Sequence, residues 1–347
     1  MVGLASFGVV GLLGDDDDPF SLAEEVTTTT SSTSTTSTST TTTTIPTTTS
    51  STLPPKGTVV IQGTGDVNLD PNYIPALGTN GYDHAWAALG GIFHEDDITV
   101  INLECAPSDI GAPEPKKFVF RCPTESLTSL APAGVEVVSM ANNHGGDYGK
   151  EALVDGRARL LEVGVAPVGA GENAAEAGKP ALFEVNGWRV AVIGFGGVFP
   201  TTTWFATDEQ PGMLNGDDIP SMVEVVQAAD EVADIVVVAI HWGVELDTEP
   251  RQDDIERAKA MVAAGADVIF GHHPHRMQPL EIIDGAAVFW SLGNFVWPNF
   301  SVAGSTTGVA RAVIHPDGTI EACLIPAFIE NPGQPALTGE PECGPGR

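Results

Sequence analysis

The hydrophobic and polar positions of this chain repeat one arrangement between residues 57 and 295. A short β-branched run is followed by a loop with polar residues and then by a stretch with helical spacing. Six apolar runs predict buried strands, at residues 58–62, 97–102, 135–140, 189–195, 235–240 and 266–271. Apolar residues three or four positions apart predict helices, at residues 150–164, 219–234 and 253–267. Near-continuous apolar strands that alternate with helices indicate sheets covered by helices, which is an α/β fold.

The C-terminal part of the chain has a different pattern. Residues 287–297 and 307–326 resemble hairpin strands, and Pro316-Asp317-Gly318 is a turn sequence within the second stretch. Residues 331–347 are rich in proline, glycine and glutamate, which predicts a tail. The folded domain is therefore expected to span residues 57–330.

Polar side chains of the kinds that bind metals follow five of the six predicted strands. They are Asp66 and Asn68, then Glu104, then Asn142, Asn143 and His144, then His241, and finally His272, His273 and His275. In an α/β sheet, binding sites form at the carboxyl ends of the strands. Five such positions, with carboxylate, amide and imidazole groups, predict one shared site.

Six of these residues supply oxygen and nitrogen donors without a thiolate: Asp66, Glu104, Asn143, His241, His273 and His275. Such a set suits one or two divalent ions, Mn, Fe or Zn, rather than a structural zinc knot. Two ions about 3.5–4 Å apart would orient water for an in-line displacement, with Glu104 or Asp66 as the bridge. On an extended segment His273 and His275 would point the same way. His144 follows a candidate ligand and is the candidate catalytic acid for a leaving group.

Several of these positions also have an ordinary structural interpretation. His241 fits a hydrogen-bonded histidine at a strand end, Asp66 fits a helix or turn cap, and Asn142-Asn143 fits a turn. The three imidazoles of "GHHPH" have little structural use, so this segment favours a metal. Three residues are expected to support the ligands: Asn68, Asn142 and His272.

Composition narrows the functional classes. The 15 basic and 46 acidic residues give a formal charge of −31, which argues against binding to nucleic acid or anionic lipid, because both are polyanions. Residues 1–14 are apolar and have the length of a signal h-region, but no basic residue precedes them. Residues 1–26 are therefore expected to be the remnant of an export signal that starts upstream, with an acidic segment, or else a disordered tail.

The next segment supports export. Residues 27–52 are Ser or Thr except Ile45 and Pro46, which predicts a disordered stalk, or a plain spacer, over residues 27–56. An extracellular or cell-surface protein is expected.

Four cysteines fit an exported protein: Cys105, Cys122, Cys323 and Cys343. An even number favours disulfides, and Cys105–Cys122 with Cys323–Cys343 is the simplest of the three pairings. Four free thiols are the alternative for a cytosolic protein.

Basic residues are scarce, so their positions are informative. Lys116, Lys117 and Arg121 share one loop, and Arg276 follows the histidines. Arg121 and Arg276 are candidates for holding a carboxylate or phosphate group of a substrate. Lys116 and Lys117 are equally well explained as surface charges.

Six motifs in order carry a resemblance to a known family: "GDVNLD", "NLECAPSD", "SMANNHGGDYG", "AIHWGVE", "GADVIFGHHPHRMQPLE" and "SLGNFVW". Over residues 57–298 the chain resembles the CapA family of poly-γ-glutamate capsule biosynthesis proteins, which is related to the calcineurin-like metallophosphoesterases. The resemblance implies a four-layer α/β/β/α sandwich with a metal centre at the strand ends. It departs from the phosphoesterase pattern at Asn68, where those enzymes have a histidine, and at Glu104, where they have an aspartate.

The leading hypothesis is a metal-dependent hydrolase in poly-γ-glutamate capsule biosynthesis, release or attachment. Its substrate would be the anionic polymer or a phosphoester, and a membrane synthase complex would be its partner. The alternative is a non-catalytic, metal-dependent polymer-binding or scaffolding subunit, which the absent histidine at position 68 favours. A generic extracellular phosphoesterase would differ only in its substrate.

Overall fold

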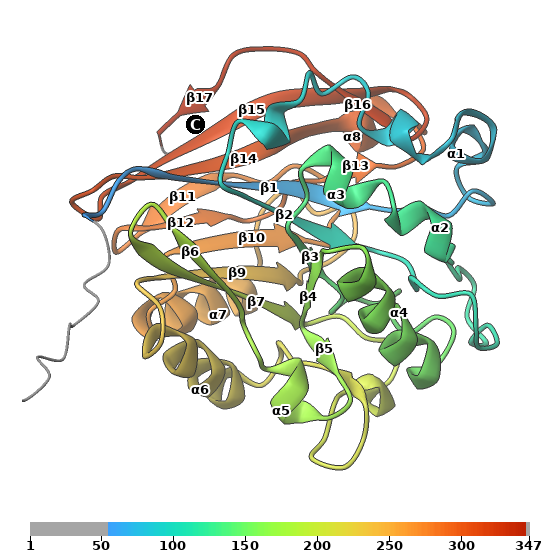
Figure 1. The fold of residues 1–347 in the computed structure, drawn as a ribbon, viewed down its shortest axis with the longest axis horizontal. Helices are drawn as coiled ribbons and strands as arrows, with labels where there is room; N and C mark the ends of the chain where they lie inside the picture. Colours follow the sequence, from blue (N-terminus) through green and yellow to red (C-terminus); the bar gives the residue numbers. More distant parts are fainter. Residues whose placement is uncertain (1–54, 345–347) are drawn as a thin grey trace, which may run out of the picture. The chain divides into compact units, whose positions relative to one another are not determined.

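The computed structural model describes residues 55–344. The expected export-signal remnant, nearly all of the expected stalk and residues 345–347 lie outside the described residues. Two large sheets dominate the described part, and its helices are arranged around them (Figure 1).

The first sheet has nine strands, and its main path runs in the order β16-β15-β14-β1-β2-β3-β4. Its strands are β1 (Val59–Val67), β2 (Ile98–Leu103), β3 (Val137–Ser139), β4 (Ala166–Val168), β13 (Asn294–Val296), β14 (Thr306–Ile314), β15 (Ile320–Asn331), β16 (Gln334–Leu337) and β17 (Glu342–Cys343). Strands β1 to β4 pair in parallel, and β13 pairs in parallel with β1. The residues that follow these strands therefore meet at one edge of the sheet.

The second sheet has six strands in the order β11-β12-β10-β9-β7-β6. They are β6 (Ala181–Val185), β7 (Trp188–Gly196), β9 (Ile235–His241), β10 (Val268–His272), β11 (Leu280–Ile283) and β12 (Ala286–Phe289). The four central strands are parallel, and their near-continuous apolar sequences match burial on both faces. A separate pair of short strands comprises β5 (Ala170–Gly171) and β8 (Gly212–Met213).

The inner faces of the two sheets pack directly on each other. Ile61 of β1 and Phe270 of β10 belong to one buried cluster that takes apolar side chains from both sheets. A Cβ atom on Gly63 would lie 2.7 Å from the Phe270 ring, so glycine at this position allows the close approach of the sheets. Burying one large apolar side chain such as Ile61 stabilises the fold by about 1.5–3 kcal/mol.

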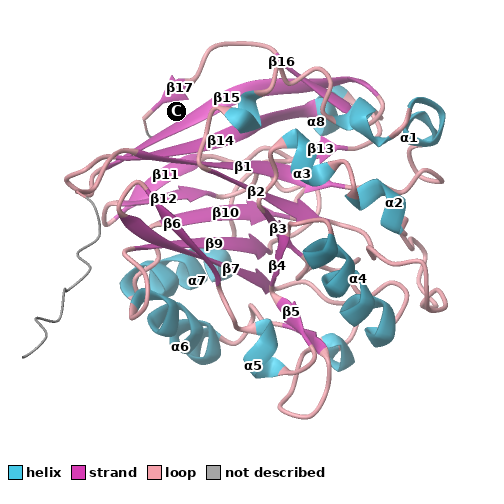
Figure 2. Cartoon of the chain, in the orientation of Figure 1, coloured by secondary structure: helices cyan, strands magenta, loops and turns pink. Residues whose placement is uncertain are grey.

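Helices cover the outer faces of both sheets, as Figure 2 shows. Helices α6 (Ile219–Asp230) and α7 (Gln252–Ala263) bury Met222 and Ala258 against the six-stranded sheet. Helices α2 (Thr124–Leu127), α3 (Leu130–Ala133) and α4 (Lys150–Glu162) bury leucines against the nine-stranded sheet. The remaining short helices are α1 (Pro75–Asn80), η1 (Tyr82–Ala85), η2 (Ile92–His94), α5 (Ala174–Ala177), η3 (Thr202–Trp204) and α8 (Val302–Ser305). The predicted four-layer α/β/β/α sandwich is confirmed. Within residues 55–344, no helix combines the length and the apolar character needed to cross a membrane.

The C-terminal third departs from the sequence expectations in two places. Residues 287–297 do not form a hairpin, because β12 joins the six-stranded sheet and β13 pairs with β1 in the other sheet. Residues expected as a tail add β16 and β17 to β15, and the Cys323–Cys343 disulfide joins β15 to β17. Local sequence reveals strand propensity but not the partner strand. The expected hairpin of β14 and β15 does form, with Gly318 at a φ of 86°.

Candidate metal centre

Two buried carboxylates form the middle of the candidate site. Asp66, near the end of β1, and Glu104, directly after β2, have no exposed surface. Asp66 Oδ1 accepts a hydrogen bond of 2.9 Å from Asn102 Nδ2, and Asp66 Oδ2 lies 3.0 Å from His275 Nδ1. Burial by itself would raise the pKa of Asp66, but these neighbours hold it below its usual range.

Glu104 has the opposite electrostatic situation. Neither of its carboxylate oxygens has a hydrogen-bond partner among the described residues. Oε1 lies 3.8 Å from His241 Nε2, 3.7 Å from His275 Nε2 and 3.9 Å from His144 Nε2. Burial and the charge of Asp66 raise the pKa of Glu104 well above its usual value. A fully buried carboxylate without donors is costly unless a cation neutralises it.

His241, the last residue of β9, is held by two side-chain amides. Its Nε2 lies 2.9 Å from Asn143 Oδ1, and its Nδ1 lies 3.2 Å from Asn102 Nδ2. Burial, and then the nearby His273, lower the pKa of His241 well below its usual value. The ring is therefore neutral at physiological pH, which is the form that binds a metal.

His273 and His275 reach the site through an irregular turn. The expectation of an extended segment is wrong here, because β10 ends at His272 and both residues have positive φ, 96° and 52°. Non-glycine residues in such conformations are strained, and strain of this kind clusters at functional sites. Both imidazoles still meet Glu104 within one group of three candidate ligand atoms.

Two groups of candidate ligands overlap at Glu104. One comprises Glu104, His273 and His275, and the other comprises Asp66, Glu104 and His241; within each group the ligand atoms lie within 4.8 Å of one another. Within residues 55–344, the oxygens of Glu104 and Nδ1 of His273 have no hydrogen-bond partner, so they are available to a cation. The donor set of carboxylate and imidazole therefore fits a divalent metal, and the shared Glu104 stands where a bridge between two ions would be.

The histidine pair gives metal binding a pH dependence. Burial alone would lower the pKa of His275, but the Glu104 and Asp66 carboxylates raise it to about 9 in the metal-free protein. A metal must displace this proton, so its apparent affinity is expected to rise by about tenfold per pH unit up to about pH 9. Titrating chelator-stripped protein with Mn²⁺ across this range measures the slope, and His275→Gln should reduce it to the part that comes from the raised pKa of Glu104. A slope of zero in the wild type would contradict the assignment of His275 as a ligand.

His144 belongs to a second constellation beside the carboxylates. Its Nδ1 lies 2.7 Å from Asp147 Oδ2, and its Nε2 faces Glu104. Asp147 is fully buried and also accepts hydrogen bonds from Lys116 Nζ (2.6 Å) and the Phe120 amide (2.7 Å). Burial lowers the pKa of His144, while the Asp147 carboxylate opposes this shift.

Two residues of the site are not among those predicted from the sequence. Asn102 bridges Asp66 and His241, and Asp147 orients His144. Asn102 is the one polar residue within the second half of the apolar strand β2, and Asp147 follows His144 by three residues. A polar residue inside an apolar strand and an acidic residue three positions after a candidate histidine are sequence signals that could have identified them. Lys116, which the sequence left open as a surface charge, is committed to Asp147 and to the Asn143 carbonyl.

The three residues expected to support the ligands are all buried near them. His272 lies 2.9 Å from the Thr64 carbonyl and 3.3 Å from the Ile240 carbonyl, so it links β1 to β9. Asn142 accepts hydrogen bonds from the His144 and Gly145 amides. Asn68 accepts from the Asp70 amide, and its Nδ2 has no partner among the described residues.

The two candidate arginines occupy different places. Arg121 donates to the carbonyl groups of Asp109, Ile110 and Gly111 and stacks over the ring of Tyr148. These contacts fasten the loop that the Cys105–Cys122 disulfide closes. Arg276 instead lines a cleft next to His144 and His275. The part of either arginine in substrate binding stays a prediction.

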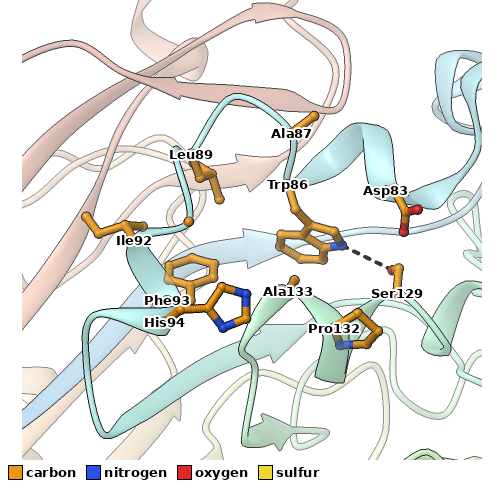
Figure 3. Close-up of a pocket in the computed structure, with 11 residues that line it drawn as sticks. Asp83, Trp86, Ala87, Leu89, Ile92, Phe93, His94, Ser129, Pro132 and Ala133 are labelled. Carbon is orange, nitrogen blue, oxygen red and sulfur yellow. Dashed lines mark hydrogen bonds between the residues drawn. The ribbon is translucent and has the colours of Figure 1, made fainter.

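The cleft beside the metal centre has a volume of about 210 Å³, and aromatic side chains form part of its wall. Phe120 packs on the His144 ring at 4.3 Å between centroids, and Trp297 packs on the His275 ring at 4.8 Å. Another hollow, of about 340 Å³, is built around Trp86 and Phe93 (Figure 3). Trp86 donates a 3.1 Å hydrogen bond to Ser129 in it, and none of its lining residues belongs to the metal centre.

Comparison with known proteins identifies relatives. "Capsule biosynthesis protein CapA" of Bacillus anthracis is 36% identical over 209 residues, which cover 59% of this chain and 51% of the relative. "PGA biosynthesis protein CapA" of Bacillus subtilis (strain 168) is 38% identical over 183 residues, which cover 52% and 48%. The chain thus spans about half the length of these curated relatives. The solved structure of a phosphatase from Mycoplasma pneumoniae is similar with a TM-score of 0.49 and 16% identity, over 78% of this chain and 94% of that one.

A family model covers the candidate centre completely. Residues 60–299 match the model described as "Bacterial capsule synthesis protein PGA_cap", and this span includes every candidate ligand from Asp66 to His275. Because the match extends over more than half of the chain, the protein belongs to the PGA_cap family of bacterial capsule synthesis proteins.

Proposed function

We propose that this protein is a metal-dependent hydrolase that acts in the biosynthesis, release or attachment of a poly-γ-glutamate capsule. The family membership supports the process. The geometry of Glu104 supports the chemistry, because a fully buried carboxylate with two unpartnered oxygens is shared by two groups of ligands. We include one or two Mn, Fe or Zn ions as the cofactor, held by Asp66, Glu104, Asn143, His241, His273 and His275.

Divalent ions at such a centre polarise a carbonyl or phosphoryl oxygen and lower the pKa of water. The chain itself supplies the proton transfer. Asp147 accepts from Nδ1 of His144 and thereby stabilises the imidazolium form, which carries a proton on Nε2. Nε2 faces the carboxylates, where it would deliver this proton to the leaving group of a phosphoester or an amide. The Lys116 ammonium balances the buried charge of Asp147.

The proposal places the protein outside the cell or on its surface. The Ser/Thr-rich residues 27–52 and the acidic composition are consistent with this location. The two disulfides also support it, because disulfides persist in oxidising compartments. A membrane-bound synthase complex is the proposed partner.

Measuring metal content together with turnover tests the proposed function directly. The purified protein is expected to contain one or two ions per chain by elemental analysis and to hydrolyse an aryl phosphodiester or a γ-glutamyl oligomer with Mn²⁺ added. His273→Ala should lose metal and turnover together, because it removes one ligand of a three-residue group. His94→Ala is the matched control, since this exposed histidine lies outside both groups. A wild-type protein without divalent metal would refute the proposal.

A second candidate function is a non-catalytic subunit that binds the polymer through a metal. The observation that favours it is Asn68, which offers no imidazole and whose side-chain oxygen already accepts a hydrogen bond from the Asp70 amide. Full capsule production by a His241→Ala/His273→Ala variant that binds no metal would refute the proposal that the protein acts as a metal-dependent hydrolase. A metal-loaded protein that hydrolyses neither substrate but retains the polymer would support the subunit.

A further inference from the structure

Apart from its histidines, the cleft beside the metal centre is lined by uncharged residues and by one charged residue of each sign. Arg276 and Glu245 are the charged residues among its lining side chains. Tyr73, Phe120 and Trp297 form a connected aromatic wall, with ring centroids 4.5 Å and 5.5 Å from that of Tyr73. Aromatic faces of this kind pack well against the methylene groups of an extended ligand.

Asn294 supplies an acceptor that the protein leaves unused. It is 3% exposed and begins β13, opposite Asp66 on β1. Its Nδ2 donates a 2.8 Å hydrogen bond to the Gly304 carbonyl, which fixes the orientation of the amide. Its Oδ1 has no partner among residues 55–344, although the side chain lines the cleft. A buried acceptor without a donor is destabilising, so a ligand that brings an N–H or O–H group gains affinity here.

Arg276 supplies donors that the protein uses only in part. Its Nη1 donates 2.7 Å to the His275 carbonyl, and no carboxylate lies within 4 Å of it in the described part of the chain. A guanidinium with free N–H groups recognises carboxylate and phosphate equally well by its charge. The neighbouring groups must therefore decide between these anions.

The polar groups converge on a glycine. A Cβ atom on Gly304 would lie 3.1 Å from Ser301 Oγ, 3.3 Å from Arg276 Nη1 and 3.7 Å from Asn294 Nδ2. The absence of a side chain at Gly304 keeps these groups accessible to one another. Arg276 and Asn294 thus lie close together in the cleft, within reach of a single small ligand group.

We propose that Arg276 and Asn294 form a specificity subsite for an N-acyl amino-acid unit. Arg276 binds the carboxylate of the unit, and Asn294 Oδ1 accepts from its amide N–H. An ionised phosphodiester offers only acceptors, so it would leave Asn294 Oδ1 unpaired and would place oxygen against oxygen. The subsite therefore selects an amide-linked acidic chain over a simple phosphoester, and it rests on the proposed function for its place beside the reacting bond.

Binding measured without turnover tests the subsite. The Mn²⁺-loaded full chain is titrated calorimetrically with N-acetylglutamate, with glutarate, which lacks the amide, and with dimethyl phosphate, which offers only acceptors. N-Acetylglutamate is expected to bind at least about tenfold more tightly than glutarate, because a site built to hydrogen-bond an N–H rejects an analogue without it. Asn294→Leu should remove this preference. Arg276→Ala should weaken both carboxylates by about tenfold or more, and Gly304→Ala should weaken them by crowding Arg276.

The controls separate the subsite from folding and from catalysis. Lys259→Ala removes one exposed positive charge on α7 and should change no affinity. Melting temperature and metal content report whether a variant is folded and loaded. Equal affinities for N-acetylglutamate and glutarate, or Arg276-dependent binding that is tightest for dimethyl phosphate, would overturn the subsite. A wild-type protein that prefers N-acetylglutamate to glutarate but shows no hydrolysis, or contains no divalent metal as purified, would overturn the proposed function and leave the subsite standing.

Discussion

Replacing Glu104 with glutamine is expected to abolish metal binding and turnover while leaving the metal-free protein at least as stable as the wild type. Glutamine preserves the size of the side chain and removes the charge that two groups of ligands share. Loss of a bridging carboxylate deprives both groups of their common donor. Metal content should therefore fall below one ion per chain, and hydrolysis should fall with it.

The raised pKa of Glu104 explains why Glu104→Gln should stabilise the metal-free protein. Burial and Asp66 raise the pKa of Glu104 well above its usual value of 4.5. The folded metal-free protein then holds a proton that the unfolded chain releases above about pH 4.5, so wild-type stability is lost as the pH rises from there. Glu104→Gln removes this loss and should raise the metal-free free energy of unfolding by about 1–3 kcal/mol at alkaline pH.

Thermal unfolding with a chelator and with Mn²⁺ measures both effects. The variant should melt at or above the wild-type temperature with chelator and below it with Mn²⁺, because only the wild type gains from the ion. Glu281→Gln, an exposed glutamate on β11, is the matched control and should change neither value. A Glu104→Gln protein that keeps its metal would refute the central position of this carboxylate.

Replacing His144 with alanine is expected to slow hydrolysis by about 10²–10⁴-fold for substrates with poor leaving groups. Its Nε2 faces Glu104, and the ring belongs to neither ligand group, so metal content should stay unchanged. An aryl ester with a stable leaving anion needs no proton and should lose much less rate. Comparing kcat for the two kinds of substrate separates proton donation from structural damage.

Asp147→Asn tests the same proton transfer with a smaller change, because it leaves the His144 ring in place. The amide keeps a hydrogen-bonding group near His144 Nδ1 but removes the charge that favours the imidazolium. We expect an intermediate loss of rate, confined to substrates with poor leaving groups, and a downward shift of the pH profile for this step. Equal losses for both kinds of substrate would show that His144 acts on structure or binding instead.

Much of the site could be anticipated because its residues follow strands in the sequence. Asp66, Glu104, His241 and the pair His273 and His275 each come after or at the end of an apolar run. Parallel strands bring such positions to one edge of a sheet. Apolar periodicity also predicted α4, α6 and α7 to within a few residues of their observed ends.

Other features depend on contacts between distant residues. Asn102 contacts His241 across 139 positions, and Asp147 meets Lys116 across 31, so no local pattern assigns their partners. The turn at His273 and His275 replaced the expected extended segment, because the strand ends where the chain must turn toward Asp66.

The sequence by itself determined the two helix-covered sheets and the edge at which oxygen and nitrogen ligands gather. Both follow from short-range patterns of burial and strand order. Only the tertiary structure decided which sheet β12 and β13 join, how Asp147 orients His144, and that Asn294 faces a cleft with an unused acceptor. These properties arise from packing between segments that lie far apart along the chain, where each side chain's partner is fixed by the fold and not by its neighbours in sequence.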